Sequence, residues 1–448
     1  MNNRSASIAV AISVDHPLVK PVSTSGGGFY VTAFALLIVM GWAFIAWLTQ
    51  YIRGLGVSGL DRPVYWGVYI TNFVFFVGIS HAGTLISAIL RVTGSEWRRP
   101  ITRAAEAITV FALMVGPINV FFDLGRPDRV LNMFLHGQLK SPLMWDVICI
   151  STYLVSSLVY LYLPLIPDIA ELRDTGIRPR WFYRLLSLNW RGTEKQKHIL
   201  EKMIRVMAIA IIPIAVSVHT VVSWVFAMTI QPMWHSTIFG PYFVVGAIFS
   251  GIASIIIAMA ILRKVYHLED YLKPIHFNNL GILLLVMTCL WVYFTFAEYL
   301  TTFYGGEPAH MAVFYSKLTG EFAPMFWSMG ILCFIIPFVI LAVGRFRTIT
   351  GTVIASISVN IGMWLERYTI VVPSLSNPRL PISEITYYPS WVEISITAGC
   401  FAGLTFFYVM FSKIFPIISI WELKEGGVDV AAGEVISSAA TSGKKRMQ

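Results

Sequence analysis

Five carboxylic acids lie within or at the ends of long apolar segments, where ionisable side chains are rare. They are Asp123, Asp146, Glu298, Glu366 and Glu393. A charge at the centre of a bilayer costs at least ~2.5–3.5 kcal/mol, so such residues are candidates for function. Carboxylates with few cations nearby repel one another, so some of them can hold or pass protons. The pattern predicts proton chemistry where these segments end.

Several acids also have a structural interpretation. Asp123 could pair with Arg126 in a turn built by Gly125 and Pro127, and Asp146 could complement the positive end of a helix dipole from its first turn. Glu106 follows Arg103 by one helical turn. The i, i+3 spacing favours a salt bridge between these two side chains.

Two histidines, His81 and His219, lie near the middle of different apolar segments. Three roles are open for them: a haem ligand pair, buried structural histidines, or contact with a quinone or a proton. Haem is the least favoured, because b-type quinol enzymes more often carry two such pairs. The other two roles remain open.

The composition defines the class of protein. Of the 448 residues, 56% are hydrophobic and 13% charged, against roughly 25% charged in soluble domains. This excludes a water-soluble globule. Stretches such as residues 204–230 are apolar on every side, whereas strands of a membrane barrel alternate apolar and polar residues. The sequence therefore predicts an all-α polytopic membrane protein.

We expect ten transmembrane helices, each long enough to cross ~30 Å of hydrocarbon. Their predicted ranges are 29–51, 66–91, 101–122, 143–163, 205–230, 241–263, 278–303, 323–344, 350–372 and 391–415. No cleaved signal peptide is visible in residues 1–28. The loops on the side of the termini, including a long loop at 164–204, carry 18 Lys and Arg, against 8 on the opposite, outer side. The positive-inside rule then places both termini in the cytoplasm.

An internal repeat organises these spans. Ser141-Pro142-Leu143-Met144-Trp145 matches Ala323-Pro324-Met325-Phe326-Trp327, and Ser217-Val218-His219 matches Ser358-Val359-Asn360. A shift of four helices predicts two parallel-repeat four-helix bundles. The predicted segments are a tail at 1–28, a flanking helix at 29–65, bundles at 66–230 and 241–372, a flanking helix at 391–415 and a tail at 416–448.

The cysteines and the net charge exclude other functions. Cys149, Cys289, Cys333 and Cys400 stand alone, without the clustered spacing that an iron–sulfur cluster or zinc requires. We therefore expect no cluster and no metal site in the chain. The net charge of +9 is read as an orientation signal of a membrane protein rather than as a nucleic-acid surface.

At these residues the sequence resembles a known family. The run Asp123-Leu124-Gly125-Arg126-Pro127-Asp128-Arg129 at an outward helix end, the histidine in the second span and the Ser-Pro-x-x-Trp start of the fourth span resemble the NrfD/PsrC membrane subunits of quinone oxidoreductases. The ten-span form is most similar to the ActC subunit of bacterial alternative complex III, with the related ActF subunit as a near neighbour. The resemblance covers roughly residues 29–415.

The resemblance implies a subunit of the bacterial inner membrane without a haem or cluster of its own. It would oxidise menaquinol or ubiquinol near the periplasmic face and pass electrons to a periplasmic iron–sulfur subunit. The complex would be completed by cytochrome c subunits and a second NrfD-like membrane subunit, and protons could be translocated.

Quinol oxidation releases two protons, so its site needs a base within ~2.6–3.2 Å of a ring hydroxyl. Asp123, His81 and Asp146 are the candidate catalytic residues, and Arg126 joins them as a quinone contact. By helix arithmetic His81 lies well below the outer edge, so one ring touching both it and Asp123 requires a kinked third span. A candidate proton path is formed by Glu106, His219, Glu298, Glu366 and Glu393.

Two other functions fit the same features. A proton-coupled secondary transporter also uses repeats with buried acids, although Gly and Pro interruptions at matching midplane positions of both halves are not evident. A structural anchor for peripheral redox subunits would need no quinol site.

Overall fold

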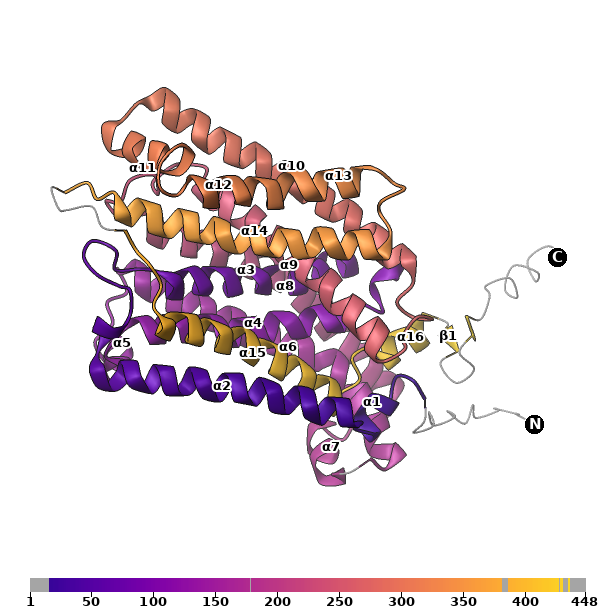
Figure 1. Ribbon diagram of the computed structural model, residues 1–448. Helices are drawn as coiled ribbons and strands as arrows, with labels where there is room; N and C mark the ends of the chain where they lie inside the picture. Colours follow the sequence, from indigo (N-terminus) through magenta and orange to yellow (C-terminus); the bar gives the residue numbers. More distant parts are fainter. Residues whose placement is uncertain (1–15, 178, 381–385, 427, 430–433, 436–448) are drawn as a thin grey trace, which may run out of the picture.

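The computed structural model describes residues 16–177, 179–380, 386–426, 428–429 and 434–435 (Figure 1). The predicted terminal tails fall partly outside them. Ten helical segments of the described chain are long and apolar enough to cross a membrane, which confirms the predicted architecture. They are α2 (Gly27–Arg53), α3 (Val68–Val92), α4 (Thr102–Asp123), α6 (Pro142–Thr175), α8 (Glu194–Ala227), α9 (Phe239–Val265), α10 (Pro274–Gly305), the continuous α12–η4–α13 (Ala323–Gly330, Ile331–Ile335 and Ile336–Ala342), α14 (Ile349–Ser376) and α15 (Trp391–Ile414).

Short elements connect the spans, precede the first span or follow the last one. They are α1 (Lys20–Ser23), η1 (Leu55–Val57), η2 (Glu96–Arg98), η3 (Pro127–Arg129), α5 (Asn132–Leu135), α7 (Arg180–Leu186), α11 (Pro308–Leu318), α16 (Ile420–Glu425), and the two-residue antiparallel strands β1 (Val428–Asp429) and β2 (Glu434–Val435). Helices α1 and α16 lie at one end of the bundle and α5 and α11 at the other, which we call the outer end (Figure 1).

The spans pack as two groups of four. Helices α3, α4, α6 and α8 contact one another around one centre, and α9, α10, α12–α13 and α14 around a second, while α2 and α15 pair along one flank. Helix α3 contacts α4, α8, α9 and α14 and is buried from Val68 to Ala88. The lipid-facing α2 instead exposes Val31, Phe34 and Ile38, as expected where lipid is the solvent.

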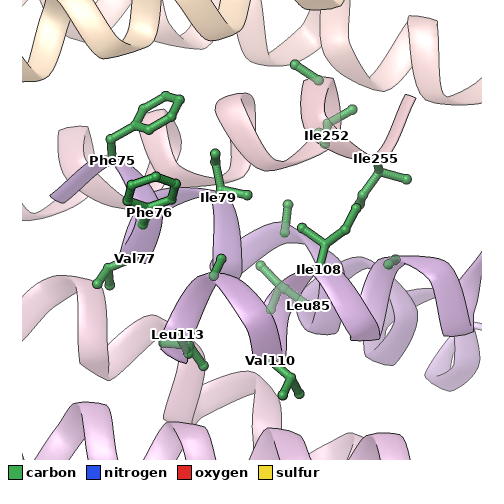
Figure 2. Close-up of a cluster of buried hydrophobic side chains, with 14 of the residues drawn as sticks. Phe75, Phe76, Val77, Ile79, Leu85, Ile108, Val110, Leu113, Ile252 and Ile255 are labelled. Atoms are coloured by element: carbon green, nitrogen blue, oxygen red, sulfur yellow. The ribbon is translucent and has the colours of Figure 1, made fainter. Parts of the chain in front are cut away.

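One part of the hydrophobic core lies where α3, α4 and α9 meet (Figure 2). Phe76, Leu113 and Ile252 are completely buried there. Two glycines permit the close approach. A Cβ on Gly83 would lie 2.0 Å from the carbonyl oxygen of Ala105 in α4, and one on Gly251 would lie 2.3 Å from the Cβ of Ala82 in α3. Small residues at such contacts are typical of helix packing in membranes.

The predicted loop at 164–204 is wrong for most of its length. Helix α6 continues to Thr175, α7 follows, and α8 begins at Glu194 with a capping box between Thr193 and Gln196. Apolar runs locate the part of a helix in hydrocarbon, but a helix continues into water wherever its polar side chains find partners. Here Asp168, inside the extension of α6, forms an ion pair with Arg103.

The same contact contradicts the predicted Arg103–Glu106 pair. The Arg103 guanidinium forms an ion pair with Asp168 and donates to the carbonyl of Pro164 at 2.9 Å and to Ser419 Oγ at 3.0 Å. Asp168 also accepts the backbone N–H groups of Ile420 and Trp421 at 3.0 and 2.8 Å. The buried Asp168 carboxylate thus binds both Arg103 and the start of α16. Arg103 therefore pairs with Asp168 rather than with Glu106, its neighbour one helical turn away.

Candidate functional site

Asp123 is the last residue of helix α4, at the outer end, and the residues around it form hydrogen bonds with one another. Gln50 of α2 donates to the carbonyl of Phe122 at 2.8 Å and accepts the hydroxyl of Tyr69 at 2.5 Å. The Oδ1 atom of Asp123 is buried without a hydrogen-bond partner. Buried polar atoms are normally paired. The Oδ1 atom of Asp123 therefore keeps an unused acceptor position.

The alternative in which Asp123 pairs with Arg126 is wrong. Gly125 takes a left-handed conformation, with φ of +63°, and this turn carries Arg126 outward. The Arg126 guanidinium is exposed and makes two hydrogen bonds of 3.1 Å to Asp128. Arg126 thus lies on the surface beside the site, not against the Asp123 carboxylate.

Asp146 is a second unpaired acid of the same bundle. It lies in the second turn of α6, which begins at the outer end with Ser141 as N-cap. The residue is 8% exposed, and its Oδ1 is buried with no hydrogen-bond partner. Two carboxylates at the outer end of one bundle therefore keep acceptor capacity.

His81 and His219 do come together, at the contact of α3 and α8. Their rings lie edge to face with centroids 4.3 Å apart, and Tyr153 lies 6.3 Å from His81. Both ring nitrogens of His81 and Nδ1 of His219 are buried without a hydrogen-bond partner. A bis-histidine haem would place its plane between the two rings, and direct ring contact leaves no room for it.

The histidine pair and Asp123 occupy different depths. Tyr69 of α3 lies beside Phe122, with ring centroids 6.4 Å apart, which places Asp123 at the level of Tyr69. His81 is twelve residues further along α3, or ~18 Å at 1.5 Å per residue. The structure therefore does not bring His81 and Asp123 to one quinol ring.

Glu106 lies on the other side of the histidine pair. Ser87 donates a 2.5 Å hydrogen bond to Glu106, and its hydroxyl lies 3.3 Å from that of Tyr160. Thr84, one turn closer to His81, has a buried hydroxyl with no partner. Glu106, Ser87 and Thr84 thus line up below His81, toward the end that carries α1 and α16.

The second bundle holds another buried polar cluster. Glu366 forms an ion pair with Arg367 and accepts a 3.5 Å hydrogen bond from Trp291. Glu298 accepts a hydrogen bond from Ser236, but its Oε1 has no partner. A cavity of about 20 Å³ between Glu298, Tyr242 and Lys317 is large enough for about one water molecule.

Glu393 stands apart from the other acids because its oxygens are occupied. It accepts the backbone N–H groups of Gly59 at 2.6 Å and Ser390 at 2.9 Å and the hydroxyl of Tyr387. These bonds close the connection between α2 and α3 over the start of α15. The geometry gives Glu393 a structural role in addition to any role in proton transfer.

Sequence reasoning missed two buried cations of the second bundle. Lys317 is one of the 8 Lys and Arg counted on the outer side, yet it is 4% exposed, with Nζ 5.9 Å from the centre of the Tyr299 ring. Arg367 is 2% exposed and lies 5.1 Å from the centre of the Phe243 ring. The available signal was the apolar run Val313-Phe314 shortly before Lys317, which is unusual for a solvated loop.

Among the described residues, one group has the composition of a metal site, where none was expected. Ligand atoms of His235, Glu307 and His310 lie within 4.8 Å of one another. The guanidinium of Arg379 pairs with the Glu307 carboxylate, so the negative charge that would attract a cation is already compensated. We interpret the group as an ion-pair cluster at the start of α11.

Known membrane proteins are similar to this chain over most of its length. The family model for polysulphide reductase, NrfD, matches residues 56–378. The C subunit of the selenate reductase of Mesobacillus selenatarsenatis is 22% identical over 87% of this chain and 94% of its own length. The Hdr-like menaquinol oxidoreductase integral membrane subunit of Archaeoglobus fulgidus is 22% identical over 87% of this chain and 95% of its own.

A third relative, from Halobacterium salinarum, is provisionally named as the C membrane subunit of a dimethyl sulfoxide reductase. It is 27% identical over 54% of this chain. The match spans only about half of that relative's length, at 53%.

Proposed function

The chain belongs to the polysulphide reductase NrfD family, and on that premise we propose that it is the quinol-oxidising membrane subunit of a multisubunit oxidoreductase. The family match and the ten membrane-crossing helices support an integral membrane subunit surrounded by lipid. The name of the archaeal menaquinol oxidoreductase subunit, matched over most of both chains, supports a quinol as substrate.

The finer assignment rests on the residue pattern of the outer end. We propose an alternative complex III type of enzyme in the bacterial inner membrane, with the outer end of the bundles facing the periplasm and both termini in the cytoplasm. A periplasmic iron–sulfur subunit accepts the electrons, and cytochrome c subunits and a second NrfD-like membrane subunit complete the complex. Menaquinol or ubiquinol is the substrate.

The observation that carries the proposal is the Oδ1 atom of Asp123 at the outer end, which is buried without a hydrogen-bond partner. Oxidation of a quinol to a quinone removes two electrons and two protons. Asp123 accepts one proton from a ring hydroxyl and releases it toward the outer surface, while the electrons pass to the iron–sulfur partner. Asp146, the second acid with a free oxygen in this bundle, serves as the second proton acceptor. Arg126 lies at the mouth of the site.

The histidine pair is assigned a relay role rather than a ring contact, because it lies ~18 Å below Asp123 by helical rise. Glu106, Ser87 and the two histidines form the inner part of a proton path. Glu366 and Glu298 continue it in the second bundle. Spatial order alone does not establish coupling, so this path is a separate hypothesis from the quinol site.

The test compares Asp123→Asn with Asp128→Asn. The first keeps the shape and hydrogen-bonding capacity of the side chain but removes its basicity, so quinol oxidation per assembled complex should fall by ~10²–10⁴. The second removes an exposed acid that pairs with Arg126 in the same turn and should leave turnover almost unchanged. Equal rates for the two variants would reject Asp123 as the base.

Two further variants locate the remaining roles. Asp146→Asn should also lower turnover, and His81→Gln should impair proton transfer more than electron transfer. Near-wild-type rates in Asp123→Asn, Asp146→Asn and His81→Gln together would move the site to Glu298 and the second bundle. Purification in mild detergent tests the class of function: co-isolation with iron–sulfur and cytochrome subunits rejects a transporter, and bound quinone rejects a simple anchor.

A further inference from the structure

A large cavity opens between α9 and α15 at the end of the molecule that carries α1. Its volume is about 1050 Å³, at the upper limit of the ~300–1,000 Å³ that is typical of small-molecule sites. Phe75 and Ile79 of α3 and Ile108 of α4 form its floor. It therefore lies outside the quinol site proposed above, in the opposite half of the bundle.

The depth of the cavity corresponds to one leaflet of a bilayer. Its wall on α9 runs from Ser254 to Val265 and its wall on α15 from Phe401 to Lys413. These are eleven and twelve residue steps, or ~16–18 Å at 1.5 Å per residue, against ~15 Å for half of a ~30 Å hydrocarbon core. The walls between are apolar, with Ile257, Ile261 and Leu404 among them. Such a space suits acyl chains.

The mouth of the cavity is basic. Lys413 and Lys20 lie there, and within the described part of the chain the cavity lining contains no acid. The ammonium group of Lys413 donates to the carbonyl of Thr24 at 3.0 Å and lies 5.2 and 5.6 Å from the ring centres of Phe29 and Tyr266. These contacts fix the charge at the mouth, while an ammonium has three N–H donors.

The start of α2 adds to the positive charge at this mouth. Gly26 is its N-cap without a side-chain capping bond, and Gly27 is the first helical residue. A Cβ added to Gly26, Gly27 or Gly28 would meet no atom within 4 Å. Open space therefore adjoins the first backbone N–H groups, at the end of a helix that favours an anion.

We propose that this cavity holds one anionic phospholipid. Its acyl chains occupy the apolar cavity, and its phosphate lies between Lys413, Lys20 and the start of α2. A quinone is less suited because it has no charge for the two lysines. The polar groups at the deep end are already paired, since Asn360 donates to Ser254 at 3.0 Å and Ser254 donates to the carbonyl of Ser250 at 2.9 Å.

The experiment reconstitutes the purified full-length protein, in its complex where one co-purifies, into vesicles of phosphatidylglycerol and phosphatidylethanolamine. It is then re-extracted in mild detergent, and the retained lipid is identified by mass spectrometry. Wild type should retain about one phosphatidylglycerol per chain. Lys413→Gln and Lys20→Gln should each weaken retention about fivefold, the factor equivalent to the ~1 kcal/mol of a basic residue near an anionic surface.

Two controls make the result decisive. Lys264 lies in the last turn of α9, at the same end but outside the cavity lining, so Lys264→Gln should retain the lipid. Ala258 lines the cavity, so Ala258→Phe should exclude the lipid while both lysines remain. Retention of phosphatidylethanolamine to the same extent, recovery of quinone in place of phospholipid, or no effect of the lysine and Ala258→Phe variants would each overturn the proposal.

Discussion

Replacing Asp168 by Asn should detach the C-terminal segment from the helical bundle. Asp168 is completely buried and accepts three groups: the Arg103 guanidinium and the N–H of Ile420 on Oδ2, and the N–H of Trp421 on Oδ1. An asparagine has one acceptor and one donor end. Whichever way its amide turns, at least one N–H group of Arg103 or α16 faces another N–H, and the arginine loses its counter-charge.

The cost follows from the burial of the pair. Breaking a buried ion pair by removing one partner costs ~3–5 kcal/mol because the other charge remains uncompensated. This is a large part of the ~5–15 kcal/mol that stabilises a typical protein. The exposed pair between Lys424 of α16 and Glu171 of α6, at 2.6 Å, supplies the matched control. Its loss in Lys424→Ala should cost less than ~1 kcal/mol.

The assay combines thermal unfolding in detergent with limited proteolysis of the C-terminal segment. Asp168→Asn should melt earlier and release α16 to protease, whereas Lys424→Ala should behave like wild type. A double variant, Arg103→Met with Asp168→Leu, removes both charges and should be more stable than Arg103→Met alone. Additive losses in the double variant, or an intact α16 in Asp168→Asn, would refute the reasoning.

Three further predictions concern pH, topology and haem. Burial lowers the pKa of Lys317 to about 8, so the unfolded chain holds this proton more tightly, and stability should rise between pH 8 and about 10 in thermal melts. Lys317→Met should lose that rise, and a flat wild-type profile would contradict the assignment. A phosphatase active only in the periplasm, fused at Gln448, should be silent; activity there would reverse the topology. A reduced-minus-oxidised spectrum of the chain freed from its partners should lack a b-type band, and a stoichiometric band lost in His81→Ala would refute this.

Hydropathy located the ten helices because lipid leaves the backbone few choices: a segment that crosses the membrane must satisfy its own hydrogen bonds. Hydropathy did not predict where the helices end, because hydrogen-bond and ion-pair partners outside the hydrocarbon determine those positions. Helix α6 extends to Thr175 past charged residues that look like a loop in sequence. One of them, Asp168, is buried against α16.

The residues of the candidate site could be predicted from the sequence, but not which side chains contact one another. Local spacing suggested Arg103 with Glu106 and Arg126 with Asp123, and both pairs are absent from the structure. Arg103 pairs with Asp168, which lies 65 positions away in the sequence. The left-handed turn at Gly125 places Arg126 against Asp128. The meeting of His81 with His219 depends on how α3 packs against α8, which no short stretch of sequence encodes.

The buried position of the Arg367 side chain restricts how the two bundles can move. Its guanidinium reaches from α14 across α9, where a Cβ on Gly246 would lie 2.7 Å from Nη2, and toward α3, where a Cβ on Gly78 would lie 3.9 Å from the same atom. Alternating access requires one repeat to rock against the other. Such rocking would pull this buried cation away from Gly78 of α3, whereas its ion-pair partner Glu366 lies beside it on α14 and would move with it. The packing of this second-bundle cation against α3 therefore opposes a rocking movement of one bundle against the other.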